Sequence, residues 1–488
     1  MMKKVCTGVL AVLTAFSMCL AGCEADKEVD IKLDPEDPTA IEIWHYYNGQ
    51  QLNSFNEMVT EFNETVGMEQ GIIVEAFSQG NVNELITKVA DAANQKVGSG
   101  EVPDMFACYA DTAYEIDKLG LLADLSPYFT KEELDEYVPS YIEEGRFDES
   151  GSLKIFPTAK SVEVMMLNKT DWDRFATAEG VDLSQLETVE GVVRTAKQYY
   201  EWTDSLTPES NDGKAFFGRD AMANYMIIGC KQLGTEIFDI KDESVQLNVN
   251  KNVIRKLWNN YYIPYICGYF GAYGNFRSDD AKTGDIIALV GSTSGAAYFP
   301  EMVTVNDGES YPIEALSLPI PVFEGGEKYN VQQGAGMAVV KSDEKKEYAA
   351  VQFLKWFTEK ERNVEFSISS GYLPVKRGAN TEEYLQQILA IDGIKKNISA
   401  NLLESLPVAF QSVRDFKLYT NKAFKNGNDA RNILEHSMQD QADADREKVI
   451  ESLKDGLSLE EAASSFTTDQ YFDSWYNQFV DRLTSAMQ

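Results

Sequence analysis

The chain has 488 residues and a formal net charge of −34, because 78 Asp and Glu outnumber 44 Lys and Arg. A chain of this length is expected to form two or three packed units, and its 44% apolar residues can fill their cores. The negative charge argues against nucleic acid or a bare anionic membrane as a partner, since both require clustered Lys and Arg. Only two histidines, His45 and His436, are present, which excludes a multi-histidine metal site and disfavours a histidine-dependent catalytic triad.

The first 23 residues resemble the export signal of a bacterial lipoprotein. Lys3 and Lys4 precede an apolar run at 5–20, which is shorter than the roughly 20 residues of a membrane-spanning helix. The run ends in LAGC at 20–23, which resembles a lipobox, where the cysteine thiol receives a diacylglyceryl group. We expect residues 1–22 to be a signal peptide and Cys23 a lipid anchor. An ordinary signal peptide that happens to contain a cysteine is the weaker alternative.

Residues 23–39 form the predicted link between the anchor and the folded body. The segment is acidic, contains prolines and has no apolar period. Because its like charges repel one another, we expect an extended tether. The lipid would hold the acidic body at the extracellular face of the bacterial cytoplasmic membrane.

Three cysteines lie beyond the tether, at Cys108, Cys230 and Cys267, and no CxxC spacing occurs among them. Each has apolar neighbours, so we expect buried thiols rather than a disulfide framework or a zinc site. No cofactor or metal is implied.

From residue 40 the pattern alternates between strands and helices. Strands are predicted at 41–44, 72–77 and 103–108, and helices at about 52–62 and 82–94. Such alternation predicts a parallel sheet covered by helices. A second α/β region follows to about residue 311, and the last third of the chain is mostly helical.

Three extended segments that contain proline, at 156–160, 316–321 and 371–375, interrupt this pattern. Three such crossings predict two lobes, each assembled from separate pieces of the chain. We expect residues 40–156 plus 312–370 in lobe 1 and residues 157–311 plus 371–488 in lobe 2.

Eight segments resemble, in order, those of extracellular solute-binding protein family 1, the receptors of carbohydrate-type ABC importers. They are IEIWH at 41–45, PDMF at 103–106, GLLADLSPYF at 120–129, the strand ending at 167–169, GSTSG at 291–295, QQGAGMAVV at 332–340, FLKWFT at 353–358 and GYLPV at 371–375. The resemblance implies the type 2 periplasmic-binding-protein-like α/β fold, with two lobes of mainly parallel sheet flanked by helices and joined by hinge strands. It also implies a solute in the cleft between the lobes, an ABC permease as partner, and a monomer.

The loop after the first strand is expected at the cleft, because open α/β sheets bind ligands at the carboxyl ends of their strands. It offers Trp44, His45, Tyr46 and Asn48. Trp44 could stack on a ligand or pack in the core. Tyr46 and Asn48 suit the hydroxyl groups of a sugar.

Within the family, the glycerol-3-phosphate-binding branch is similar in part. Five residues correspond to branch positions near the bound phosphate: Ser161, Ser294, Gly334, Tyr372 and Arg431. The guanidinium of Arg431 would grip a phosphate, carboxylate or diol, although a helix-surface arginine is the alternative. Two branch positions that contact glycerol through a tyrosine and a glutamate correspond here to Val82 and Ala110, so this side of the pocket departs from the branch.

An aromatic-rich interval lies on either side of GSTSG. It comprises Tyr269, Phe270, Tyr273, Phe276 and Tyr298, with Gly268, Gly271 and Gly274 interleaved. Because the glycines indicate a loop rather than a packed helix, Tyr273 and Tyr298 are predicted to stack on a sugar ring.

The sequence therefore favours a lipid-anchored receptor that captures a carbohydrate and passes it to an ABC permease. A glycerol-phosphate-type solute is an alternative. A secreted glycoside hydrolase is an alternative of another class and would need two carboxylates about 5–10 Å apart. With 78 acidic residues such a pair can always be nominated, so this signal is weak.

Overall fold

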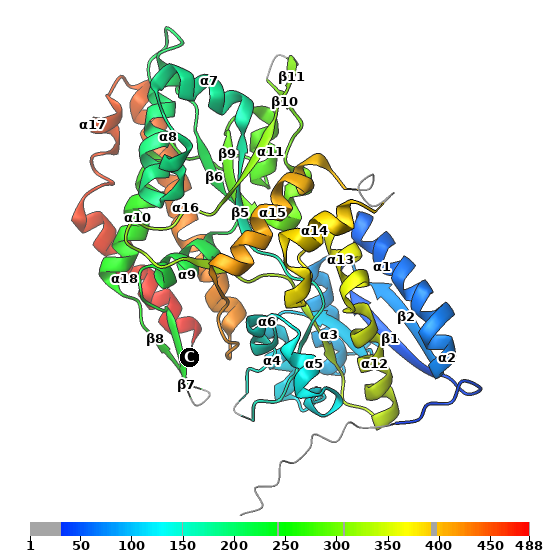
Figure 1. Cartoon of the computed structure of the whole chain (residues 1–488). Coiled ribbons are helices and arrows are strands. Elements are labelled where there is room, and N and C mark those ends of the chain that lie inside the picture. Colours follow the sequence, from blue (N-terminus) through cyan, green and yellow to red (C-terminus); the bar gives the residue numbers. More distant parts are fainter. Residues whose placement is uncertain (1–30, 149, 242–243, 306–307, 392–397, 488) are drawn as a thin grey trace, which may run out of the picture.

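The structure is a computed structural model that describes residues 31–148, 150–241, 244–305, 308–391 and 398–487. It has two lobes, each built around its own sheet (Figure 1). The N-terminal elements, coloured blue and cyan, form one lobe together with yellow helices, and the green segments and red C-terminal helices belong to the other. The predicted signal peptide, Cys23 and the first part of the tether lie outside the described residues.

The first lobe contains a five-stranded sheet in the order β2-β1-β3-β14-β4. Its strands are β1 (Thr39–His45), β2 (Ile72–Ser78), β3 (Met105–Cys108), β4 (Phe156–Pro157) and β14 (Gly336–Val339). Strand β1 pairs in parallel with β2 and β3, as the alternating pattern predicts. Strand β14 runs antiparallel to β3 and β4, because the chain enters it from the other lobe.

The helices of this lobe have clear local causes. They are α1 (Gly49–Phe62), α2 (Met68–Gln70), α3 (Val82–Ala93), α4 (Ala110–Lys118), α5 (Lys131–Asp135), α6 (Pro139–Glu144), α12 (Glu344–Phe357) and α13 (Lys360–Ser370). Helix α1 buries Phe55, Met58 and Phe62, the spacing of one helical face. Helix α3 begins with a capping box in which Asn81 and Glu84 satisfy each other's backbone N–H groups.

The second lobe contains a four-stranded sheet in the order β12-β5-β9-β6. Its strands are β5 (Glu163–Asn168), β6 (Phe217–Arg219), β9 (Ala288–Ser292) and β12 (Ala315–Pro319). Strand β5 is antiparallel to both β12 and β9, and only β6 and β9 are parallel. The predicted α/β class is confirmed, but the sheets are mixed rather than mainly parallel, because β5 leaves the hinge whereas β12 returns to it.

Helices of the second lobe lie on both faces of its sheet. They are α7 (Lys169–Glu179), α8 (Val189–Asp204), α9 (Met222–Gln232), α10 (Lys251–Ile266), α11 (Arg277–Thr283), α14 (Glu382–Leu389), α15 (Ala400–Asp415), α16 (Gly427–Lys454), α17 (Leu459–Ala463) and α18 (Asp469–Ala486). Of these, α17 and α18 pack against α16 rather than on the sheet. Three further strand pairs are β7 (Phe238–Lys241) with β8 (Ser244–Leu247), β10 (Met302–Thr304) with β11 (Ser310–Pro312), and β13 (Tyr329–Val331) with β15 (Lys417–Tyr419).

One predicted lobe boundary needs a correction. The boundary at residue 312 assigns β12 to the first lobe, but Leu316 of β12 pairs with Leu167 of β5 in the second sheet. The proline-containing segment at 316–321 is therefore the last strand of the second lobe before the chain crosses. The other boundaries stay a prediction.

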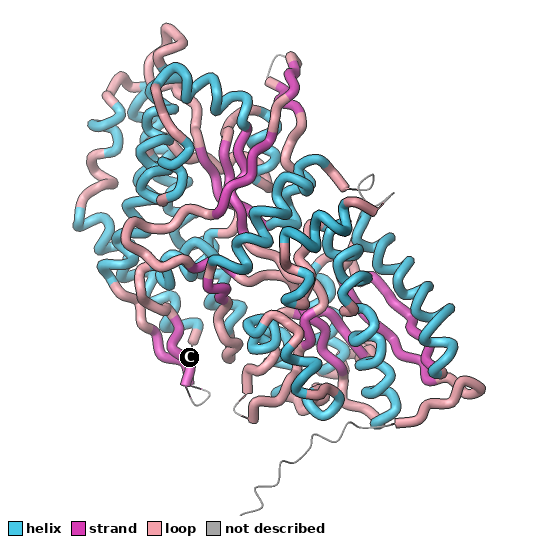
Figure 2. Tube along the Cα trace, viewed as in Figure 1, coloured by secondary structure: helices cyan, strands magenta, loops and turns pink. Residues whose placement is uncertain are grey.

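The three connections between the lobes lie side by side as a hinge. The backbone N–H of Lys160 donates to Leu373 O at 3.1 Å, and Ser161 and Gln333 exchange two backbone hydrogen bonds of 2.9 Å. Figure 2 shows loop segments between the strands of the two sheets. Because each crossing is bonded to a neighbour, the lobes are joined by a narrow ribbon rather than by independent linkers.

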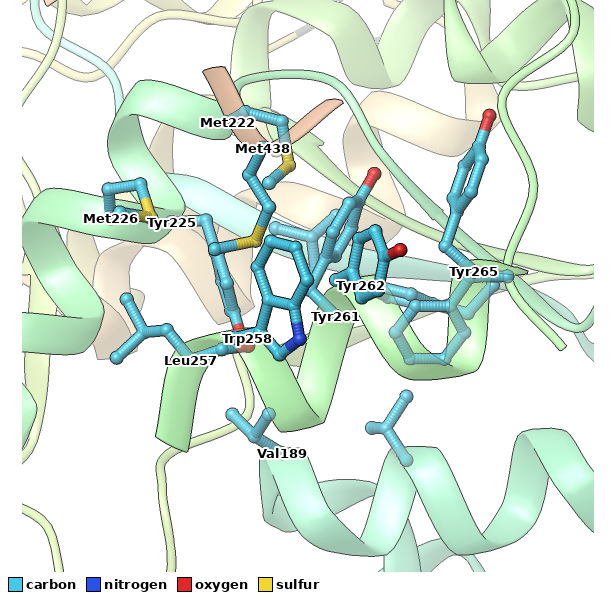
Figure 3. Packing of buried hydrophobic residues seen from close by; sticks show 14 of the residues in the cluster. Val189, Met222, Tyr225, Met226, Leu257, Trp258, Tyr261, Tyr262, Tyr265 and Met438 are labelled. Carbon is cyan, nitrogen blue, oxygen red and sulfur yellow. The ribbon is translucent and has the colours of Figure 1, made fainter. Parts of the chain in front are cut away.

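Each lobe has its own core. In the second lobe, Trp258, Tyr261, Tyr262 and Tyr265 form an aromatic stripe on α10 (Figure 3), and the rings of Trp258 and Tyr262 stack at 3.6 Å. The predicted burial of the thiols is confirmed, since Cys108, Cys230 and Cys267 are free and buried. Among the described residues, no helix is both long and apolar enough to cross a membrane.

Candidate ligand-binding site

A cavity of about 480 Å³ lies between the two lobes, beside the hinge. Residues of the first lobe that line it include Val82, Ile86, Tyr109, Ala110, Asp111 and Glu144. The hinge and second lobe contribute Ser161, Asn224, Ser292, Ser294, Gln332, Gln333, Gly334, Tyr372, Thr420, Asn421, Phe424, Asn428 and Arg431, among others. Five of the predicted site residues are therefore brought together: Ser161, Ser294, Gly334, Tyr372 and Arg431.

Three serine hydroxyls form a row on the second-lobe side. Ser292 Oγ lies 3.2 Å from Ser161 Oγ and 2.9 Å from Ser294 Oγ. Ser161 precedes β5 in the hinge, and Ser292 ends the neighbouring strand β9, so the sheet register fixes their separation. Hydroxyls both donate and accept hydrogen bonds, so this row can complement either hydroxyls or anionic oxygens.

A buried ion pair supports Arg431 from behind. The guanidinium of Arg431 donates to Asn224 Oδ1 at 2.7 Å, and Asn224 Nδ2 donates to Glu163 Oε1 at 2.8 Å. Glu163 also pairs with Arg219, and both side chains are buried. Burial raises the pKa of Glu163, an effect that Arg219 and Asn224 oppose. Arg431 is exposed to the cavity, and its hydrogen bond to Asn224 fixes the orientation of its side chain.

Asp111 reaches from the first lobe toward the start of α16 in the second lobe. Its carboxylate accepts a hydrogen bond from the backbone N–H of Phe424, and a Cβ on Gly427 would lie only 2.4 Å from Oδ1. Burial raises the pKa of Asp111 to about 6, while the charge of Arg431 acts in the opposite direction. A glycine at 427 is thus what allows this carboxylate to approach the helix.

A second buried network lies at the floor of the cavity. Lys160 Nζ contacts Glu144 Oε2 at 2.7 Å and Gly334 O at 2.7 Å, and the same carboxylate accepts from Gln332 Nε2. Gly334 has a φ of +92°, and a Cβ there would be 2.6 Å from Ala159 O. The close approach of the two hinge segments therefore requires glycine at this position.

Tyr372 forms part of the wall, with Tyr46 directly behind it. Burial raises the pKa of Tyr372, while hydrogen bonding with Tyr46, Gln51 and Ser294 lowers it. Tyr46 does not line the cavity itself, although it supports a residue that does.

The structure places the other predicted site residues outside the cavity lining. His45 is fully buried against aromatic rings, its Nδ1 accepts a backbone N–H, and burial lowers its pKa to about 4. Trp44 Nε1 donates to Glu42, and Asn48 occupies the N-cap position of α1 without a side-chain hydrogen bond to the helix. The side chains of Tyr273 and Tyr298 are 64% and 73% exposed. Alternation along β1 explains His45, because successive strand residues point to opposite faces.

Several lining residues were not predicted, although some had a signal. Gln332 and Gln333 belong to the QQGAGMAVV segment, and Ser292 belongs to GSTSG. Asn224 had no such signal, since it lies in the apolar stretch of α9. Among the described residues, no group of three His, Cys, Asp or Glu side chains could hold a metal ion.

The sequence matches the family model of the bacterial extracellular solute-binding proteins over residues 57–389. The chain belongs to this family. The predicted resemblance is confirmed, and the protein is a receptor for a solute rather than a glycoside hydrolase.

Solved structures of solute-binding proteins share this fold at low sequence identity. A cyclic α-maltosyl-1,6-maltose binding protein from Arthrobacter globiformis is 17% identical with a TM-score of 0.64, and the match covers 92% of this chain and 99% of that one. UgpB from Mycobacterium tuberculosis, in complex with glycerophosphocholine, is 17% identical with a TM-score of 0.63, covering 92% and 100%.

A third structure is an ABC substrate-binding protein from Listeria monocytogenes in complex with cycloalternan. It is 17% identical with a TM-score of 0.60, and the match covers 91% of this chain and 99% of that one. These likenesses confirm the two-lobed fold. No functionally curated protein matches the sequence.

Proposed function

We propose that this solute-binding protein captures a carbohydrate between its lobes and delivers it to an ABC permease. The observation that carries the proposal is the chemistry of the cavity, where hydroxyl and amide side chains from both lobes and the hinge surround a space of about 480 Å³. Sugar hydroxyls donate and accept at once, and this mixture of groups matches them. Sugar-binding proteins among the solved structures of this fold add support.

The charges of the cavity favour a neutral solute. Asp111 faces the space from the first lobe and Arg431 provides a cation from the second, while the charge of Glu144 is balanced by Lys160, so the two walls nearly cancel in charge. A carboxylate accepts sugar hydroxyls well but repels a phosphate, and desolvation during closure strengthens that repulsion.

A glycerol-phosphate-type solute is the second candidate, and Arg431 beside the serine row is the observation that favours it. A guanidinium with neighbouring hydroxyls can hold a phosphate through paired hydrogen bonds. UgpB, in complex with glycerophosphocholine, has the same fold.

Isothermal titration calorimetry would test both candidates. The panel would contain maltotriose, mannotriose and cycloalternan against glycerol 3-phosphate and glycerophosphocholine. We expect at least one saccharide to bind with a Kd of about 1 μM or tighter, which corresponds to roughly −8 kcal/mol. Binding of a phosphorylated solute alone would favour the second candidate, and a folded protein that binds nothing in the panel would contradict the carbohydrate proposal.

The remaining parts of the proposal concern location and delivery. We propose that Cys23 carries the lipid, that the acidic tether holds the monomeric receptor at the outer face of the cytoplasmic membrane, and that closure of the lobes around the solute is what the permease recognises. In a bacterial host, the wild-type protein is expected in the membrane fraction. Cys23→Ala is expected in the medium or periplasm, and its retention in the membrane would contradict the anchor.

A further inference from the structure

A second cavity, of about 330 Å³, lies beside the first between α6 of the first lobe and strands β7 and β15 of the second. Four residues line both cavities: Glu144, Gln332, Thr420 and Asn421. Figure 1 shows that α6 and β7 belong to different lobes, so this space, like the first, has walls from both. The two cavities are therefore neighbouring parts of one interlobe groove.

Gln332 stands at the junction with an unused hydrogen-bond acceptor. Its side chain is 4% exposed, and its Nε2 donates to Ser140 O at 3.0 Å and to the Glu144 carboxylate. Both partners are acceptors, which fixes the orientation of the amide. Gln332 Oε1 is then buried with no hydrogen-bond partner. An acceptor that is buried without a hydrogen-bond donor raises the free energy of the folded protein. A ligand with a donor group could remove this cost by bonding to Gln332 Oε1.

The second cavity offers surfaces that suit a sugar ring. Phe147 and Tyr419 provide apolar faces, with the buried Phe238 beneath them, and Glu143 provides a carboxylate at the rim. The hydroxyl of Tyr419 donates to Glu236, so its ring is held in place. Apolar ring faces and acceptors together match the apolar face and the hydroxyl edge of a pyranose.

We infer that the solute is an elongated saccharide of at least two rings, with a hydroxyl donating to Gln332 Oε1 at the junction and a further ring in the second cavity. This inference rests on the proposed carbohydrate function. It adds that contacts in the second cavity increase the affinity for a longer saccharide, whereas a monosaccharide bound in the first cavity makes none of these contacts.

Calorimetry with two length series, glucose–maltose–maltotriose and mannose–mannobiose–mannotriose, tests it. In the series that binds, the Kd is expected to fall at least about tenfold from the monosaccharide to the trisaccharide. Glu143→Trp places a bulky ring at the rim of the second cavity and is expected to remove that gain while leaving the Kd of the monosaccharide unchanged. Glu143 is exposed, so this variant should keep the wild-type Tm.

The matched control is Glu132→Trp, the same change at an exposed residue that does not line either cavity. It should bind like the wild type. If mono- and trisaccharide bind equally well, or if Glu143→Trp retains the gain, the inference is overturned while the carbohydrate proposal stands. If no saccharide binds, both are overturned together.

Gln332→Met provides a second test. It keeps the side-chain length but lacks both the carbonyl oxygen and the Nε2 group that bonds Ser140 O and Glu144, so the Kd of the monosaccharide in the same variant is the control for the loss of those two bonds. The Kd of the trisaccharide is expected to rise about tenfold, the loss of roughly one hydrogen bond in a dry site. An unchanged trisaccharide Kd would contradict the role of Gln332 Oε1, and the Tm of the variant reports whether the fold is kept.

Discussion

The two walls of the first cavity differ in how they are built. The second-lobe wall presents the serine row and Arg431, and hydrogen bonds connect Arg431 through Asn224 to the buried Glu163–Arg219 pair. The first-lobe wall presents the apolar side chains of Val82, Ile86 and Ala110 beside the carboxylates. The second-lobe wall is therefore pre-organised to orient the polar groups of a ligand. The first-lobe wall can cover the ligand, and its carboxylates disfavour ligands with negative charge.

If this comparison is correct, the largest effect of a single change should come from the support of the polar wall. Glu163→Ala leaves Arg219 buried without its partner. We expect the free energy of unfolding to fall by about 3–5 kcal/mol, measured by urea denaturation. The control Glu201→Ala removes a surface pair with Lys197, whose atoms lie 3.6 Å apart, and should cost less than about 1 kcal/mol. Equal losses in the two variants would contradict the buried role of Glu163.

The polar wall itself should dominate binding. Arg431→Met keeps the apolar stem but removes the guanidinium, and we expect the Kd of the bound solute to rise about 10- to 100-fold in calorimetry. Arg482→Met, at an exposed position on α18, is the matched control and should bind like the wild type. If Arg431→Met also binds normally, Arg431 is only a surface residue of its helix.

The charged part of the first-lobe wall should be visible in the pH dependence of stability. Because burial raises the pKa of Asp111 from 3.8 to about 6, the folded state binds this proton more tightly than the unfolded state. The contribution of Asp111 to stability is therefore most favourable below pH 3.8 and is lost as the pH rises to 6.

Asp111→Asn removes this titration. The difference in unfolding free energy between wild type and variant should change by about 1–2 kcal/mol between pH 4 and pH 6, against the wild type at the higher pH. Denaturation curves at a series of pH values measure it. A difference that stays constant with pH would mean that Asp111 is not desolvated in the cleft.

The smallest effect is expected outside both walls. Tyr273 is 64% exposed and does not line the cavity, so Tyr273→Ala should change the Kd by less than about twofold. A much larger rise in the Kd would support the predicted stacking of Tyr273 on a sugar ring and would show that the lobes close further around the solute than they do in this structure.

Much of the fold follows from local patterns. The strands β1, β2 and β3 and the helices between them are visible as short apolar runs and helical spacing. Two of the three proline-marked segments, at 156–160 and 371–375, lie at crossings, whereas the third contains β12 of the second sheet. Strand direction is not local. It depends on where the chain crosses between the lobes, which is after β12 and before β14, so neither the antiparallel pairings nor the place of β12 could be read from the order of elements.

The site shows the same difference between residues that a local sequence pattern indicates and residues that only the folded structure brings together. Five of the predicted residues line the cavity, and each lies in or near a recognisable segment: Ser161, Ser294, Gly334, Tyr372 and Arg431. The contributions of Asn224 and Asp111 come from side chains that meet only after the lobes are assembled. His45 illustrates the reverse case, since its place at the end of a strand suggested the cleft, but the pleat of β1 turns it into the core.

A crystal structure of the protein grown with the saccharide that binds most tightly would test most directly whether the solute is held between the two walls. We expect density in the first cavity, with hydroxyls bonded to the serine row and Arg431 on one side and to Asp111 or Glu144 on the other. A saccharide bound elsewhere on the surface, or one that contacts a single lobe, would contradict this expectation.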